Sequence, residues 1–363
     1  MLRCTQTSRA LLLALVVAGL PLVAGCPRQP AAQPPTPAVQ PRPKTPPTVQ
    51  PSPRAPGSKL KFAIVPKMRD NPVFVLAKDG ALAEAKALGD VEVLYEAPPE
   101  GDAVKQAEIV RSLIAKRVDG MAISCNNADV LKDPINEAMA AGIPTICFDS
   151  DSPGSQRILY YGVDSRKAGA KLGELLVKAL GTDLEGDVGQ VTGVAGAPNL
   201  EERMDGLREY LAQKAPKLKL LPAQPCDDST TTGLQVVQDI LRGHPDLKGL
   251  ILVGGWPIFS EFPGPFAEYP EPTKAKVVSF DALETEWEYV RRGYVYALVA
   301  QRCFHWGKES VRILHEIVVD KRQYDTQFVD GGMDLVVRDK ALADQIGGVT
   351  VDVYAERWRT KRF

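Results

Sequence analysis

Acidic, amide and aromatic residues follow several short apolar runs of this chain, and their types suit the binding of a small polar ligand. The residues at these positions are Asn71, Phe74, Asp149, Asp151, Arg203, Asp228, Trp256, Asp281 and Gln301. Carboxylates, an arginine and amides pair with neighbouring hydroxyl groups, and aromatic rings pack on the apolar face of a sugar. The set therefore predicts a pocket for a sugar-like ligand.

Each of these residues also has a plain structural explanation. Asp149 or Asp281 could cap a helix, Arg203 could form a surface ion pair, and Trp256 could pack in a core. For any single residue the two explanations are about equally good. The gathering of the whole set at strand ends favours the pocket, because ligands bind beyond the carboxyl ends of parallel strands.

Paired carboxylates also suggest hydrolysis. Asp149 and Asp281 could act as the two acids of a glycoside hydrolase, which must stand at a defined separation across the scissile bond. Binding already explains both residues, so we expect a protein that is not an enzyme and has no catalytic residue and no cofactor. The cysteines and the three histidines show no metal-ligand spacing, which predicts no metal site.

The elements that must position these residues form two similar α/β halves. The first half has expected strands at 62–65, 91–95, 121–124 and 144–148 and expected helices at 71–89, 102–117 and 130–141. The second half has expected strands at 188–192, 218–221, 250–253, 276–280 and 296–300 and expected helices at 199–212 and 229–242. Continuous apolar strands between helices predict parallel sheets covered on both faces, and two such units predict two lobes with a cleft.

The beginning of the chain differs from the rest. Arg3 and Arg9 precede an apolar run at 11–20, and small residues lead to Cys26. The run is too short to span a bilayer comfortably, so it predicts a signal peptide rather than an uncleaved membrane anchor. Small residues before a cysteine resemble the lipobox of bacterial lipoproteins, in which the cysteine is acylated and anchors the protein. Residues 27–58 are rich in proline and predict an extended tether.

Net charge and cysteine content bear on two further properties, nucleic-acid binding and disulfide formation. The chain has 363 residues and a net charge of −1, which gives no electrostatic footprint for nucleic acid. After cleavage four cysteines other than Cys26 remain. Cys125 and Cys147 end neighbouring predicted strands and could pair, although buried free thiols are the favoured interpretation.

Six segments occur in a distinctive order: DNPVFVLAKDGALAEAKALG, AAGIPTICFDSDSP, GVAGAPNLEERMDG, GHPDLKG, VVSFDA and the final glutamine of YALVAQ. From about Leu60 to Val337 the chain resembles the sugar-binding group of type I periplasmic binding proteins, nearest to its ribose-binding members. The resemblance implies an α/β fold of two Rossmann-like lobes with parallel sheets, joined by a three-strand hinge that crosses near Val163, Gln301 and Asp330. It implies ligand contacts by Asn71, Phe74, Asp149, Arg203, Asp281 and Gln301.

The sequence departs from the ribose-binding pattern at four places. Val73 replaces an aromatic ring, Ser150 replaces an arginine, Asp228 replaces an aromatic residue, and the stretch 254–257 replaces an Asn-Asp pair. The prolines at 263, 265, 270 and 272 exclude the regular helix usual in the following segment. Trp256 could supply the missing stacking and Asp151 a polar contact, so we expect a monosaccharide or small polyol other than plain ribose.

The expected domains are a lipoprotein signal peptide at 1–26, a Pro-rich tether at 27–58, an N-terminal lobe at 59–163 plus 302–335, and a C-terminal lobe at 164–301 plus 336–363. The resemblance implies a protein that delivers its ligand to an ABC permease. We also expect a monomer that is lipid-anchored outside the cytoplasm and binds no nucleic acid. A DNA-binding repressor is rejected because the signal and tether stand where its DNA-binding helices would lie. The alternative is a sensor component for a chemoreceptor or sensor kinase, including one for a ligand like autoinducer-2. The segment 338–363 could add a strand or stay loosely ordered.

Overall fold

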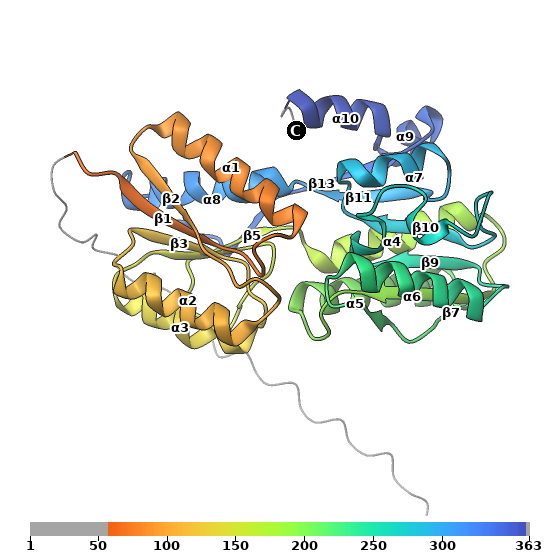
Figure 1. The fold of residues 1–363 in the computed structure, drawn as a ribbon, viewed down its shortest axis with the longest axis horizontal. Coiled ribbons are helices and arrows are strands. Elements are labelled where there is room, and N and C mark those ends of the chain that lie inside the picture. The colour runs from red at the N-terminus through yellow and green to blue at the C-terminus, as the bar shows by residue number, and fades with distance from the viewer. Residues whose placement is uncertain (1–56, 361–363) are drawn as a thin grey trace, which may run out of the picture. The chain divides into compact units, whose positions relative to one another are not determined.

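The computed structural model describes residues 57–360, which contain two separate β-sheets flanked by helices (Figure 1). The first sheet is parallel throughout and has the strand order β12-β5-β4-β3-β1-β2. Its strands are β1 (Leu60–Val65), β2 (Val91–Tyr95), β3 (Gly120–Ile123), β4 (Thr145–Phe148), β5 (Tyr160–Gly162) and β12 (Phe328–Asp330). Its helices are α1 (Pro72–Leu88), α2 (Ala103–Ala115), α3 (Ala128–Ala140) and α8 (Cys303–Val318). We call this sheet and its helices the first lobe.

The second sheet has the order β14-β13-β11-β10-β9-β6-β7, with β8 also paired to β6. Its strands are β6 (Gly186–Thr192), β7 (Leu218–Leu220), β8 (Gln224–Pro225), β9 (Gly249–Leu252), β10 (Lys276–Phe280), β11 (Ala297–Gln301), β13 (Met333–Val337) and β14 (Val349–Thr350). Its helices are α4 (Ser165–Leu180), α5 (Pro198–Lys214), α6 (Thr230–Gly243), α7 (Trp287–Arg291), α9 (Lys340–Ile346) and α10 (Val351–Thr360). Only β11 and β13 pair antiparallel among these described strands. We call this sheet and its helices the second lobe.

Helix α1 begins and ends where its capping residues predict. Asn71 caps α1 by accepting a hydrogen bond from the backbone N–H of Val73 at 3.1 Å, and Pro72 follows at the first helical position. Gly89 ends the helix in the left-handed conformation, with φ at 84°. The predicted α1 is therefore confirmed to within a residue, and its start is fixed next to the carboxyl end of β1.

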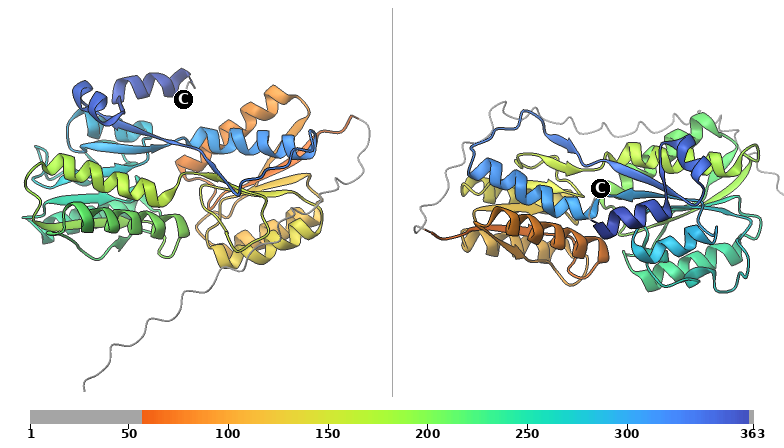
Figure 2. Two further views of the ribbon diagram at one scale, coloured as in Figure 1. Left: turned by 180° about the vertical axis from the view of Figure 1, so that it is seen from behind. Right: turned by 90° about the horizontal axis from the view of Figure 1, so that it is seen from above.

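The apolar core of the first lobe has two layers. One layer lies between the sheet and the pair α1 and α8, and the other lies between the sheet and the pair α2 and α3. Figure 2 shows α8, in blue, packed along α1, in orange. The predicted sheet covered on both faces is confirmed for this lobe. Among residues 57–360, no helix has the length and apolar character needed to cross a bilayer.

The chain passes between the two lobes three times, as the fold class requires. The passages follow β5, β11 and β12, at Val163, Arg302 and the pair Gly331-Gly332. Strand β13 begins at Met333 and pairs with β11 of the second sheet. The second lobe therefore begins again at Met333, whereas the first lobe was predicted to extend to residue 335. The exact division into domains stays a prediction.

Two segments of the second lobe can be compared with the structure that the sequence predicts for them. The segment after β9 forms short 3₁₀ turns at Trp256–Ile258 and Gly264–Phe266 in place of a regular helix, as its prolines predict. Residues 338–360 were expected to add a strand or stay loosely ordered, and that expectation was incomplete. They form the short strand β14 together with α9 and α10, because Val351, Tyr354 and Ala355 bury apolar side chains against the second lobe.

Cys125 and Cys147 are free thiols with their sulfur atoms 3.8 Å apart. The strand register pairs Ile123 with Cys147, so Cys125 stands two residues further along its strand. Residues offset in this way have more distant backbones than directly paired residues, which disfavours a disulfide. The structure agrees with the favoured interpretation of buried thiols.

Glycines allow α4 and α5 to approach at backbone distance. A Cβ atom at Gly169 of α4 would overlap the carbonyl group of Arg203 on α5, and a Cβ atom at Gly206 of α5 would overlap the carbonyl group of Arg166 on α4. The two contacts are reciprocal and leave no space for a methyl group. The position of Arg203 in the second lobe therefore depends on glycine at 169.

Replacing Gly169 by alanine is expected to lower the free energy of unfolding by about 1–3 kcal/mol, because α4 and α5 must separate to admit the methyl group. Chemical denaturation measures the change. Gly243→Ala is the control, since a Cβ atom at this residue of α6 meets open space. The inference of a fixed α4–α5 contact is wrong if both variants unfold like the unmodified protein.

Candidate functional site

A small cavity lies where residues from the carboxyl ends of both sheets come together. Its volume is about 30 Å³, and this holds only a few water molecules because one water needs roughly 10–15 Å³. Eight of the nine predicted ligand residues line it, namely Asn71, Phe74, Asp149, Arg203, Asp228, Trp256, Asp281 and Gln301. The structure thus brings together side chains from both lobes that are up to 230 positions apart, from Asn71 to Gln301.

The ninth predicted residue, Asp151, does not line the cavity. Its carboxylate accepts hydrogen bonds from the Nε and Nη2 atoms of Arg157, and the backbone N–H of Ser152 donates to it as well. The prediction missed this pairing with an arginine only six residues away. Cys26, the predicted lipidation site, lies outside the described residues.

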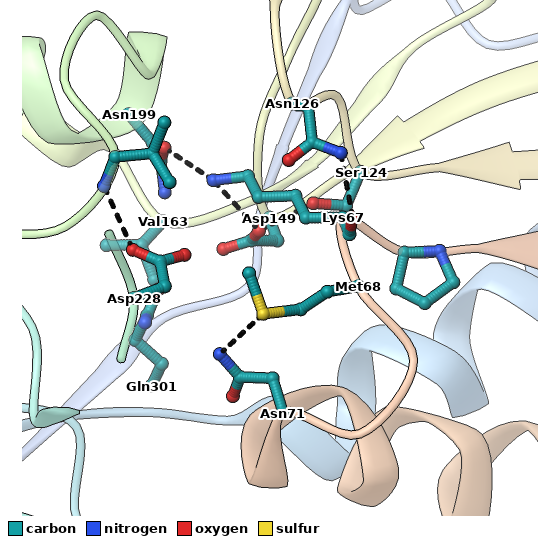
Figure 3. A network of polar contacts seen from close by, with 12 residues as sticks. Lys67, Met68, Asn71, Ser124, Asn126, Asp149, Val163, Asn199, Asp228 and Gln301 are labelled. Carbon is teal, nitrogen blue, oxygen red and sulfur yellow. Dashed lines mark hydrogen bonds and ion pairs between the residues drawn. The ribbon is translucent and has the colours of Figure 1, made fainter. Parts of the chain in front are cut away.

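Lys67 is a site residue that the sequence analysis missed. It follows β1, is 5% exposed, and donates from Nζ to the side-chain oxygen of Asn199 at 2.9 Å (Figure 3). Its Nζ also lies 3.7 Å from Oδ2 of Asp149, which accepts a hydrogen bond from the Ser124 hydroxyl at 2.6 Å. An ammonium group of the first lobe therefore binds an amide of the second lobe inside the cavity. Its position directly after a strand was the signal that could have identified it.

Arg203 is held in place from two sides. Its guanidinium lies 3.4 Å from the centre of the Phe280 ring, and Nη1 donates to the carbonyl oxygen of Val253 at 2.5 Å. Burial lowers the pKa of this group, and the negative charge of Asp281 opposes that shift. The buried Nε atom has no hydrogen-bond partner among residues 57–360. This N–H group is therefore available to a ligand oxygen.

Asp281 and Asp149 follow their strands in the left-handed conformation, with φ at 67° and 56°. Aspartate tolerates this region better than most residues, and the resulting turn directs the carboxylates beyond the strand ends. Oδ1 of Asp281 accepts from Gln301 Nε2 at 2.7 Å, and Oδ2 accepts from the backbone N–H of Gly255 at 3.1 Å. Burial raises the pKa of Asp281, while Arg203, Gln301 and Gly255 oppose the rise.

Asp228 brings a third carboxylate to the same cavity. Its Oδ1 accepts from the backbone N–H of Val194 at 3.1 Å. Burial raises its pKa to about 6, Lys67 and the Val194 hydrogen bond lower it, and the charges of Asp149 and Asp281 add to the rise. Three carboxylates against the two cations Lys67 and Arg203 leave an excess of negative charge that favours a proton on Asp228.

Aromatic rings enclose the remaining sides of the cavity. Trp256 comes from the second lobe, and Phe74 and Trp306 come from α1 and α8 of the first lobe. Phe74 and Trp306 have ring centres 6.2 Å apart, and both also lie near Phe148 at 6.5 and 6.3 Å. Trp306 therefore has both packing contacts and a place in the cavity wall.

The departures from the ribose-binding pattern are distributed around this site. Val73 and Asp228 line the cavity. The hydroxyl of Ser150 is buried, has no hydrogen-bond partner within the described part of the chain, and lies outside the lining. Among the described residues, the arginine that lines the cavity is Arg203 alone. The cavity therefore combines one arginine and one lysine with three carboxylates.

Comparison with known proteins agrees with this geometry. Residues 62–322 match the family model described as periplasmic binding protein domain. The ribose import binding protein of Salmonella typhimurium is 26% identical over 72% of this chain and 86% of its own length. The D-apiose import binding protein of Paraburkholderia graminis is 32% identical over 52% of this chain and 60% of its own length.

A solved structure extends the comparison to the fold. The ABC transporter solute-binding protein of Burkholderia graminis in complex with D-arabinose is 29% identical, covers 82% of this chain and 100% of its own, and superposes with a TM-score of 0.71. The chain belongs to the periplasmic binding protein family, and the type I fold of two lobes joined by three crossings is confirmed. The relatives are import binding proteins for sugars.

The shifted pKa of Asp228 predicts a pH-dependent stability. Its pKa of about 6 lies above the usual value of 3.8, so the native state holds this proton more tightly than the unfolded chain does. The native state therefore loses stability as the pH rises from about 4 through 6. At pH 7, Asp228→Asn is expected to unfold at a higher denaturant concentration than the unmodified protein, with a free energy of unfolding greater by up to about 3 kcal/mol. At pH 4 the two proteins are expected to be equally stable.

Asp227→Asn is the matched control, because Asp227 is exposed and has the same left-handed backbone, with φ at 52°. It is expected to leave the pH dependence unchanged. Identical pH dependence for Asp228→Asn and the unmodified protein would contradict the assigned burial of this carboxyl group.

Proposed function

We propose that this protein captures a monosaccharide or similar small polyol in the cavity between its lobes and delivers it to an ABC permease. The observation that carries the proposal is the convergence of Asp149, Arg203 and Asp281 from both lobes on one cavity bounded by aromatic rings. Fixed acceptors and donors discriminate between hydroxylated ligands, because a missing hydroxyl leaves a buried polar group unpaired. The relatives named above bind sugars for import, which supports the same role here.

Ligand entry requires the lobes to separate. The cavity of about 30 Å³ is too small for a sugar while Lys67 occupies it. Rotation about the three crossings opens the cleft, and closure over the ligand excludes water and strengthens each polar contact. In the closed complex the ligand hydroxyls replace the Lys67 ammonium as partners of Asn199 and Asp149. A ligand that binds the closed form better shifts the population toward it.

The protein acts in this proposal as a binding protein and not as an enzyme. Both oxygens of Asp281 accept hydrogen bonds from the chain, and Asp149 lies between a serine hydroxyl and an ammonium group. These contacts orient the two carboxylates as acceptors for ligand hydroxyls. The import role of the relatives points the same way.

The proposal includes a lipid anchor at Cys26, with residues 27–58 as a tether and the two lobes outside the cytoplasm. The anchor rests on the short apolar run and the small residues that precede Cys26. Holding the lobes near a membrane keeps the loaded protein close to its permease, because tethering raises the effective concentration of one partner near the other. A monomer is sufficient for this role, since one chain supplies both sides of the cavity.

Arg203→Lys is expected to weaken ligand binding at least tenfold, because lysine keeps the charge but lacks the Nε–H group and the planar fork. The ligand is first found by a thermal-shift screen of pentoses, hexoses, deoxyhexoses and polyols, and its affinity is then measured by calorimetry. Arg208→Lys is the control, since Arg208 lies on the same helix and its side chain is 64% exposed. Equal affinities of the two variants would contradict the assigned site.

Cys26→Ala is expected to move the protein from the membrane fraction to the soluble or secreted fraction, because alanine offers no thiol for acylation. Fractionation followed by immunoblotting measures the distribution, and Cys4→Ala serves as the control. Retention of Cys26→Ala in the membrane at the unmodified level would exclude this anchor.

A further inference from the structure

The last helix of the described chain, α10, is fixed to the second lobe by aromatic packing. Tyr354 and Trp358 of α10 lie against Trp287 of α7, with ring centres 6.4 and 6.0 Å from it and nearly perpendicular planes. Arg291 of α7 also donates to Asp352 of α10 at 3.0 Å. Figure 1 shows α10 running beside α7. These contacts determine where the Trp358 ring lies.

Trp358 lies at the boundary between the lobes, where it lines a groove together with residues of α1. It packs against the apolar core of the second lobe and also against the cluster in which Leu283 joins the α1 and α8 side of the first lobe. Phe259, in the segment after β9, has the same double contact. Leu283, which follows β10, is itself a member of that first-lobe cluster. Leu283 thus makes an apolar contact across the cleft, and Trp358 and Phe259 pack against the cluster that contains it.

The first-lobe side of this contact is the beginning of α1. Pro72, Val75 and Leu76 line a groove of about 430 Å³ together with Leu283 and Trp358. Val75 is 40% exposed and forms part of the first-lobe wall of this groove. Because the groove has walls from both lobes, it exists only while the lobes are together.

The groove and the ligand cavity share their supporting segments. On the first turn of α1, Asn71 and Phe74 line the cavity, whereas Pro72 and Val75 line the groove. After β10, Asp281 lines the cavity and Leu283 lines the groove two residues later. Closing the cavity over a ligand therefore brings the apolar side chains together in the same movement.

We propose that Trp358 is a positioning residue for ligand capture, because it completes an apolar contact between the lobes that favours the closed conformation without touching the ligand. Apolar area is removed from water only on closure, and this free energy adds to that of the ligand contacts. The apparent dissociation constant of a ligand rises in proportion as the closed, binding-competent population falls. This inference rests on the proposed capture of a ligand by closure.

The test weakens the contact from each lobe separately. Trp358→Ala and Val75→Ser are both expected to weaken binding of the sugar found by the thermal-shift screen about tenfold, and to increase the radius of gyration of the ligand-free protein in small-angle X-ray scattering. Trp358→Phe keeps a large ring and is expected to recover most of the affinity. Val75 is partly exposed on a helix surface, so its replacement tests the contact even if Trp358→Ala perturbs the packing of α10.

Two controls separate this role from general destabilisation. Val353→Ala changes an exposed residue of α10, and Val319→Ser changes an exposed residue at the end of α8, with exposures of 47% and 44%. Both are expected to leave affinity and radius of gyration unchanged. The proposal is overturned if Trp358→Ala and Val75→Ser behave like these controls in scattering. Scattering of the ligand-free protein tests the contact even when no sugar binds, and a failure of every sugar to bind would contradict the proposed function instead.

Discussion

A hydrogen bond from Lys67 to Asn199 joins the two lobes through the middle of the candidate site. The ammonium group is almost fully buried, and Asp149 supplies the opposite charge that offsets the cost of removing it from water. The small cavity and the apolar contact at Trp358 both belong to this closed arrangement. A ligand that takes over the partners of Lys67 exchanges one set of polar contacts for another. In the proposed complex the ligand therefore takes the place that the Lys67 side chain holds in this structure.

Much of the fold could be predicted because local signals and the fold agree. The cap at Asn71 and the terminating Gly89 fixed the limits of α1, and continuous apolar runs fixed the parallel strands. Helix α4 had no counterpart among the predicted elements, since Gly169 and Gly173 stand on its buried face where apolar side chains would mark a helix. Both glycines lie in the contact with α5, and a local sequence pattern does not reveal such a contact. The strand after residue 338 was among the expectations, but the helices α9 and α10 were not, because α10 is stabilised by packing against the distant helix α7.

The candidate site was predictable where topology alone positions a residue. Parallel strands end at one edge, so Asp149 and Asp281 could be assigned without coordinates, and the structure brings them to one cavity. Lys67 was missed because a lysine after a strand is usually exposed, and its burial depends on an asparagine 132 residues later. Asp151 does not line the cavity because its carboxylate pairs with Arg157, and its role as a ligand contact stays a prediction.

The glycine contact between α4 and α5 has a consequence for the evolution and design of new specificities. Arg203 sits on a helix whose backbone touches its neighbour, so it cannot shift to suit a different ligand without disrupting the second lobe. Asp228 and Trp256 instead stand on loops and turns, where sequence change is tolerated more readily. To give this protein a new ligand specificity, for example for a biosensor, those loops should therefore be randomised while α4 and α5 are left unchanged.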